Sequence, residues 1–80
     1  MEYVYDYSRL IGRIFEKLGS KFKYIQQMGF SEPTGYGKLK GEKEFTQSEI
    51  SKSCEILDIP EEEIPVFFFK RVLRKLNEAD

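Results

Sequence analysis

Histidine is absent from this sequence, and Cys54 is its single cysteine. The absence of imidazole excludes zinc sites that need histidine ligands, and it leaves Cys54 without a base that could activate it as a nucleophile. A single cysteine cannot form an internal disulfide. Because Cys54 falls among apolar positions of a predicted helix, we expect a buried, reduced thiol. We therefore predict no metal site, no cofactor, no catalytic residues and no enzymatic activity.

Long apolar runs are lacking as well. No stretch approaches the roughly 20 apolar residues that span a bilayer. The first residues, MEYVYDYSR, place acids where a signal peptide needs a basic and then an apolar run. Both absences predict a cytoplasmic protein with no membrane partner.

A strong excess of charge of either sign is also missing, because the net charge is −1. The charges are unevenly spread. Residues 21–45 hold five lysines and three glutamates, whereas residues 46–65 hold one lysine and six acids. Nucleic-acid binding needs a basic face rather than a basic total. The lysine-rich segment is thus a candidate DNA face, although the small total argues against tight non-specific binding to DNA.

Three consecutive acids, Glu61, Glu62 and Glu63, follow Pro60. Consecutive carboxylates on a helix do not face one another, so this run does not predict a metal site or an acid–base pair. We expect a solvated first turn of a helix, which the helix dipole favours. Because the run would repel DNA, it should lie away from any DNA-binding face.

Apolar residues recur at helical spacing along most of the chain. They predict an all-α fold, a compact bundle of four to five short helices in a single domain over residues 1–80. The first helix follows Asp6 as N-cap and ends at Gly19. The second is capped by Ser20 and ends at Gly29. Its predicted buried face consists of Phe22, Ile25 and Met28.

Two further helices are predicted in the second half of the chain. Thr46 and Glu49 form a capping box that starts one of them. A C-terminal amphipathic helix is expected over about 65–77, with Phe67 outside its apolar stripe. The stripe could close the core or form a dimer or partner interface. The candidate interface residues are Phe67, Phe68, Val72 and Leu76.

The segment over residues 32–41 is the weakest helical prediction. Pro33 is acceptable in a first helical turn, but Gly35 and Gly37 each cost about 1 kcal/mol relative to alanine inside a helix. Local signals therefore predict a loop or a frayed helix that is short or mobile in the free protein.

A helix from Ser20, a turn at Gly29, Phe30 and Ser31, and a lysine-rich segment that ends at Gly41 have the outline of a helix-turn-helix. The stretches DYSRLIGRIFEKLGS (6–20), MGFSEPT (28–34) and KLKGEKEFTQSEISKSCEILDIPEEEIPVFF (38–68) carry a wider resemblance. They resemble the small Cro/C1-type helix-turn-helix regulators of temperate phages and prophages in Gram-positive bacteria. Within that group, they are similar to an uncharacterised phage-protein family.

This resemblance implies a lambda-repressor-like fold and a transcriptional regulator that binds double-stranded operator DNA as a homodimer. Ser31 matches the cap of the recognition helix, and Thr34 matches a polar position that faces DNA. Four residues depart from the family pattern. Pro33 replaces a position that is often basic or polar, and Gly37 stands at a helix position that usually carries a side chain. Gly35 stands where a branched apolar residue usually locks the recognition helix, and Ile25 stands where a small residue, usually alanine, lets the two helices cross closely.

Base-edge contacts supply sequence preference and phosphate contacts supply affinity. We expect segment 31–41 to enter the major groove, lysines to hold phosphates, and the helix start at Thr46 to meet the phosphate backbone. The alternative for this segment is a solvated, lysine-rich loop. The predicted DNA-binding residues are Lys21, Lys23, Ser31, Pro33, Thr34, Tyr36, Lys38, Lys40, Lys43, Thr46 and Gln47.

An alternative function uses the same fold without binding DNA. In this interpretation the protein is an antirepressor or modulator, and its surface binds a phage repressor protein. The near-zero charge and the two glycines at positions 35 and 37 favour this alternative function. The lysines at positions 38, 40 and 43 favour DNA.

Overall fold

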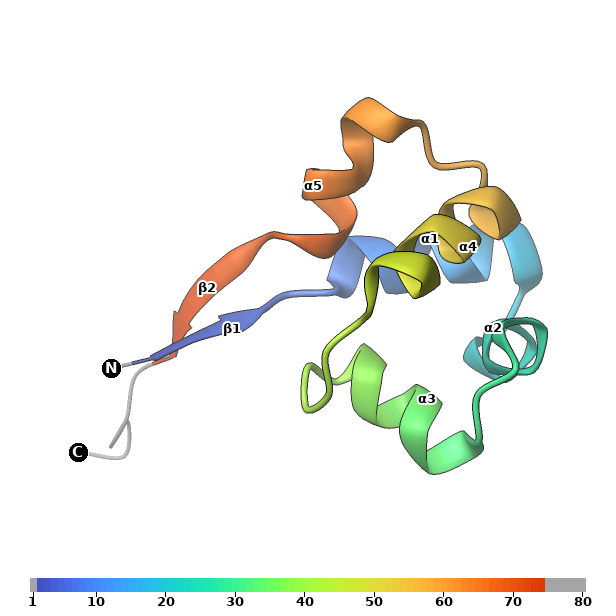
Figure 1. Ribbon diagram of the computed structural model, residues 1–80, viewed down its shortest axis with the longest axis horizontal. Coiled ribbons are helices and arrows are strands. Elements are labelled where there is room, and N and C mark those ends of the chain that lie inside the picture. The colour runs from blue at the N-terminus through green and yellow to red at the C-terminus, as the bar shows by residue number, and fades with distance from the viewer. Residues whose placement is uncertain (1, 75–80) are drawn as a thin grey trace.

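The computed structural model describes residues 2–74 of the chain. Its elements in chain order are β1 (Glu2–Tyr5), α1 (Ser8–Leu18), α2 (Lys21–Met28), α3 (Glu32–Leu39), α4 (Gln47–Leu57), the 3₁₀ turn η1 (Glu61–Glu63), α5 (Ile64–Phe68) and β2 (Arg71–Arg74). The predicted bundle of four to five short helices is confirmed, with a small sheet added to it (Figure 1). No helix within residues 2–74 is long and apolar enough to cross a bilayer.

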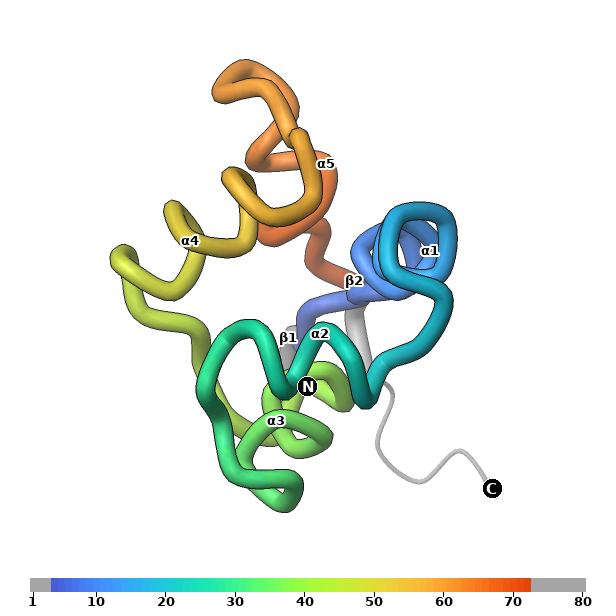
Figure 2. The backbone as a smooth tube through the Cα atoms, turned by 90° about the vertical axis from the view of Figure 1, so that its right-hand side faces the viewer, coloured from blue at the N-terminus to red at the C-terminus, as the bar shows by residue number. Residues whose placement is uncertain are grey.

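The helices pack around one continuous apolar core. Helix α1 contacts α2, α4 and α5, and α2 also contacts α3 and α4. Helices α3 and α5 lie at opposite ends of this body in both views (Figure 1, Figure 2). The most deeply buried side chains are Leu10, Ile14, Tyr24, Ile25, Leu57 and Phe68.

Helix α2 buries Ile25 and Met28, as its apolar pattern predicts, but Tyr24 takes the place expected for Phe22. Tyr24 is fully buried, whereas Phe22 is 43% exposed, so the expectation for Phe22 is wrong. The buried tyrosine is tolerated because its hydroxyl shares a 2.6 Å hydrogen bond with Ser53. Burial raises the pKa of Tyr24 to about 12.

The predicted caps at Ser20 and Thr46 and the predicted ends at Gly19 and Gly29 are confirmed. The N-cap of α1 is Tyr7 rather than Asp6, so that prediction is wrong, although the Asp6 carboxylate accepts a hydrogen bond from the Ser8 N–H at 2.9 Å. The Ser20 hydroxyl accepts a hydrogen bond from the backbone N–H of Lys23, and Gly19 and Gly29 end α1 and α2 with φ angles of +87° and +83°. At α4, Thr46 and Glu49 cap each other's backbone N–H groups. These ends are local features, so the residues beside them suffice to set them.

Segment 32–39 is a regular helix, so the prediction of a loop or frayed helix there is wrong. The Ser31 hydroxyl accepts from the Thr34 N–H, and Pro33 occupies the first turn, where no donor is needed. The decisive contact is with α2. A Cβ atom on Gly35 would lie 2.6 Å from Cγ1 of Ile25 and 2.9 Å from its Cγ2 and Cδ1.

The departures from the family pattern at Gly35 and Ile25 therefore compensate each other. Ile25, which is 1% exposed, fills the space that a side chain at position 35 would need. The apolar contact that joins the two helices is retained, but its large member lies on α2 and its small member on α3. Tertiary packing thus outweighs the low helix propensity of glycine.

Lys38 anchors α3 to the start of α4. Its ammonium nitrogen lies 2.9 Å from Oε1 of Glu49 and donates to the carbonyl of Glu44 at 2.6 Å. It also lies over the rings of Phe30 and Phe45, 5.4 and 5.7 Å from their centroids. An amine this deeply buried is stable only because all these groups compensate its lost hydration.

The end of the described chain differs from the predicted helix over 65–77. Helix α5 ends at Phe68, and Arg71–Arg74 forms β2, which pairs antiparallel with β1. Val4 lies opposite Val72, and Tyr5 lies opposite Arg71. The two strands extend from the helical body as a ribbon (Figure 1). Apolar residues four apart suit a helix, but a partner strand at the other end of the chain outweighs that pattern.

Gly35→Ala is expected to destabilise the protein by about 1–3 kcal/mol, because the added methyl group collides with a buried, branched side chain. In an Ile25→Ala background, the same change should stabilise by roughly 1 kcal/mol, because the clash is gone and alanine favours the helix. Urea unfolding of the four proteins in this cycle measures the reversal of sign.

Gly12→Ala is the matched control. A Cβ at Gly12 would meet nothing within 4 Å, so this variant should be as stable as the parent or more stable by up to about 1 kcal/mol. If Gly35→Ala has the same effect in both backgrounds, the Ile25–Gly35 contact does not control this packing.

The Lys38–Glu49 pair should make stability depend on acid pH. Burial of Glu49 acts to raise its pKa, but hydrogen bonds from Thr46 and Lys38 and the charge of Lys38 together lower it from 4.5. The folded-state pKa is thus the lower one, so the stabilisation is present above about pH 5 and is lost as the pH falls toward 2.

Glu49→Gln keeps an oxygen for the cap but removes the charge. It should cost about 1–3 kcal/mol at pH 7, since Lys38 loses a charged acceptor, and nearly nothing close to pH 2. Glu55→Gln, an exposed position on the same helix, should have little effect at either pH. Unfolding curves across the pH range test this, and a Glu49→Gln deficit that persists undiminished in acid would contradict it.

Candidate functional site

The residues predicted to contact DNA lie on the first turn of α2, on α3 and around its two ends, and at the start of α4. Seven of them are exposed, namely Lys23, Ser31, Pro33, Lys40, Lys43, Thr46 and Gln47. Lys21 and Thr34 are half-buried. The structure therefore brings most of the predicted residues to one region of the surface, beside the Gly29–Ser31 turn and α3.

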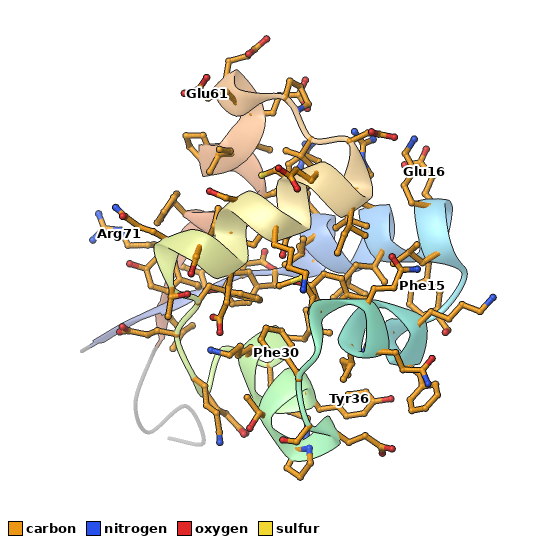
Figure 3. All side chains as sticks on the ribbon, turned by 45° about the vertical axis from the view of Figure 1, so that its right-hand side comes forward. Phe15, Glu16, Phe30, Tyr36, Glu61 and Arg71 are labelled. Carbon is orange, nitrogen blue, oxygen red and sulfur yellow. The ribbon has the colours of Figure 1, made fainter. Side chains whose placement is uncertain are left out.

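Lys38 does not face outward, so the expectation that it faces the major groove is wrong, whereas the prediction for Tyr36 stays a prediction. Lys38 is 7% exposed, and its charge is held by Glu49. Tyr36 is half-buried and packs against the core, as does Phe30 on the turn before α3 (Figure 3). The solvent-facing charges at the two ends of α3 are then Glu32 and Lys40, one of each sign.

The start of α4 is already occupied by its own capping groups. The Glu49 N–H donates to the Thr46 hydroxyl at 3.2 Å, and the Thr46 N–H donates to the Glu49 carboxylate at 2.9 Å. A carboxylate therefore sits at the positive end of this helix dipole. The backbone N–H groups of Thr46 and Glu49 are therefore not free to bind a phosphate.

The predicted dimer or partner interface is only partly at the surface. Phe67 and Phe68 are 8% and 2% exposed, so the expectation that they form a free contact surface is wrong. Phe67 is covered by Arg13, whose guanidinium carbon lies 5.6 Å from the ring centroid. Val72 is 38% exposed on β2, and Leu76 lies outside the described residues.

An aromatic pocket near the strands is absent from the sequence-based predictions. It is a hollow of about 130 Å³ lined by Tyr5, Tyr7, Glu44, Phe45, Ile50, Phe68 and Phe69. Its rings contact one another from Tyr5 to Tyr7, Tyr7 to Phe45 and Phe45 to Phe68, at centroid distances of 6.3, 5.3 and 5.3 Å. The density of aromatic residues at both ends of the chain is the one sequence signal that could have indicated it.

Several large apolar side chains are exposed on the described surface, two of them at the pocket. They are Tyr5, Phe15, Phe22, Val66, Phe69 and Val72. Cys54 is free and half-buried, and burial raises the pKa of its thiol. Glu61 projects into solvent at the end of the molecule opposite α3 (Figure 3), so the acidic run lies far from the lysines around α3.

Comparison with known proteins adds two findings. Residues 3–71 match the family described as "Protein of unknown function (DUF739)". Among solved structures, the chain is similar to the modulator of repression (MOR) of the temperate bacteriophage TP901-1 from Lactococcus lactis. The two chains share 38% identity, the alignment covers 82% of this chain and 89% of the other, and the TM-score is 0.73. A search of curated proteins found no match.

These matches bear on the resemblance derived from the sequence. A relationship to a phage regulatory protein is confirmed, whereas the narrower Cro/C1 type stays a prediction. The family match spans every described helix and reaches into both strands. The chain therefore belongs to the DUF739 family and shares its fold with a phage protein that modulates repression.

Proposed function

We propose that this protein regulates a phage repressor by binding the repressor protein itself. The proposal is supported by the similarity to a phage modulator of repression across most of both chains. Modulation of repression requires contact either with the repressor or with its DNA. The surface chemistry of α3 favours the first of these.

The observation that carries the proposal is the inward position of Lys38. Base edges in the major groove are usually read by arginine, lysine, asparagine or glutamine side chains. Helix α3 has one side chain of these types, Lys38, and its ammonium group is bound to Glu49 and to the Glu44 carbonyl. Glu32 at the start of the helix is exposed and would approach phosphates with a like charge.

The exposed apolar side chains give a protein partner a surface to bind. Phe15 and Phe22 are 50% and 43% exposed, and Phe69 is 51% exposed. Aromatic residues are enriched where proteins bind one another, because each ring buries a large area with few rotatable bonds. Val72 is also an exposed apolar residue. Of the interface residues predicted from the sequence, it stays the candidate for self-association or partner binding.

Operator binding is the second candidate, and one observation favours it. Lys40 and Lys43 are exposed after α3, and Lys23 is exposed on α2. Three lysines around one helix can hold phosphates with little sequence preference. This arrangement is compatible with weak DNA binding by the chain alone or with DNA contact inside a complex with the repressor.

Two binding measurements separate these functions. Titration calorimetry with the repressor encoded by the same phage should show complex formation. Fluorescence anisotropy with operator DNA, in about 50 mM salt and without repressor, should show no binding by the chain alone, because α3 presents no exposed arginine, lysine, asparagine or glutamine to the bases. Sedimentation of the chain alone tests the homodimer in the same buffer.

The opposite pattern would contradict the proposal. DNA binding that weakens with salt, and whose salt slope falls by about one unit in Lys40→Ala, would assign operator binding to this face. Arg9→Ala removes one positive charge from an exposed position on α1 and serves as the control for general loss of charge. Equal effects of the two variants would mean that DNA binding is not localised to the lysines after α3.

A further inference from the structure

We propose that the aromatic pocket binds an arginine side chain of the partner protein. The inference rests on the proposed function, because it assigns a specific contact to the protein–protein interface. It begins from the composition of the pocket, in which five aromatic rings surround one carboxylate and one isoleucine. That combination suits a cation with flat, weakly hydrated faces.

The rings at the base of the pocket are buried, and the rings at its rim are exposed to solvent. Tyr7 and Phe68 are buried and form the base, while Tyr5 and Phe69 are 38% and 51% exposed. The exposed pair meet edge to face at a centroid distance of 6.5 Å. Ring faces attract cations through their quadrupoles, and arginine is the side chain that most often uses this contact. The volume also fits, since a cavity of roughly 150 Å³ accommodates benzene.

Glu44 supplies the negative charge that attracts the guanidinium group. Its side chain is exposed at the pocket, and no ion pair or hydrogen bond to its carboxylate occurs among the described residues. Burial raises the pKa of the Tyr7 hydroxyl, with smaller contributions from Tyr5 and from Glu44, so the field of this carboxylate reaches into the pocket. The nearby lysine, Lys70, is paired with Asp6 at 3.6 Å.

The same protein already binds one of its own cations in this way. Lys38 lies over Phe30 and Phe45, with the carboxylate of Glu49 and the carbonyl of Glu44 as its polar partners. Phe45 and Glu44 contribute to both places, since both residues also line the pocket. The pocket thus repeats a cation site whose geometry is visible next to it.

Arginine fits this pocket better than the other residues that could enter it. Its guanidinium stacks on rings, sheds water more easily than an ammonium group and can bind a carboxylate through two parallel hydrogen bonds. A purely apolar side chain would fill the space between the rings but would strip water from Glu44 without replacing its hydrogen bonds.

N-acetyl-arginine N-methylamide is the probe for this site. In ¹H–¹⁵N NMR titrations at constant ionic strength, it should shift the amide signals of Tyr5, Phe45 and Phe69 in a saturable manner. The neutral citrulline analogue, of nearly the same shape, should bind at least about 3–10-fold more weakly. The leucine analogue tests the apolar alternative.

Glu44→Gln and Glu42→Gln form the matched pair of variants. Both positions are exposed in the loop before α4, and both changes remove one negative charge, but Glu44 alone lines the pocket. Glu44→Gln should weaken binding of the arginine probe and of the repressor by about 3–10-fold, and Glu42→Gln should change neither by more than about 2-fold.

The outcomes separate the pocket from the proposed function. Absence of saturable shifts, equal responses to arginine and citrulline, a stronger response to the leucine analogue, or equal repressor affinity of the two variants would each overturn the arginine site. If the repressor still binds in those cases, the proposed function stands. Specific binding of the arginine probe without any repressor binding would support the pocket and overturn the proposed function instead.

Discussion

The arrangement of this protein depends on how closely α2 and α3 approach each other at Ile25 and Gly35. The branched side chain occupies the space in which any Cβ at position 35 would lie, so the two helices can cross at this separation only with glycine there. The resemblance to helix-turn-helix regulators implies a small residue on the first helix and a large one on the second, and in this protein the sizes are exchanged. Ile25 on α2 fills the space beside Gly35 on α3, as expected if packing rather than side-chain identity is what the fold requires.

The close approach of α2 and α3 also determines which side chains α3 presents to a partner. With Gly35 and Gly37 on the helix and Leu39 in the core, the face left to solvent is short and carries few functional groups. Lys38 extends inward to the start of α4, where it neutralises Glu49 and covers two aromatic rings. The basic residue at the centre of the segment thus stabilises the fold, and recognition falls to groups around the helix.

Residues close in sequence account for what could be predicted, and distant partners account for the rest. Ser20, Gly29 and the Thr46–Glu49 box specify helix ends by bonds within a few residues, and these were correct. The strand at Arg71–Arg74 needs β1 from the opposite end of the chain, and Phe67 is buried because Arg13 of α1 covers it. The pocket could not be predicted for the same reason, since its residues Tyr5, Glu44 and Phe69 are distant in sequence and are brought together only by the complete fold. A lysine-rich composition likewise does not reveal which lysine lies beside a half-buried carboxylate.

The pairing of β1 with β2 has a consequence for how the protein is made. Strand β1 is synthesised before all the described helices, and its partner at Arg71–Arg74 is synthesised only after them. At ordinary rates of translation, β1 waits on the order of several seconds for β2. During that interval the helices can pack, but a tyrosine- and valine-rich strand has no partner from its own chain, and chaperones or neighbouring nascent chains have their best opportunity to bind it.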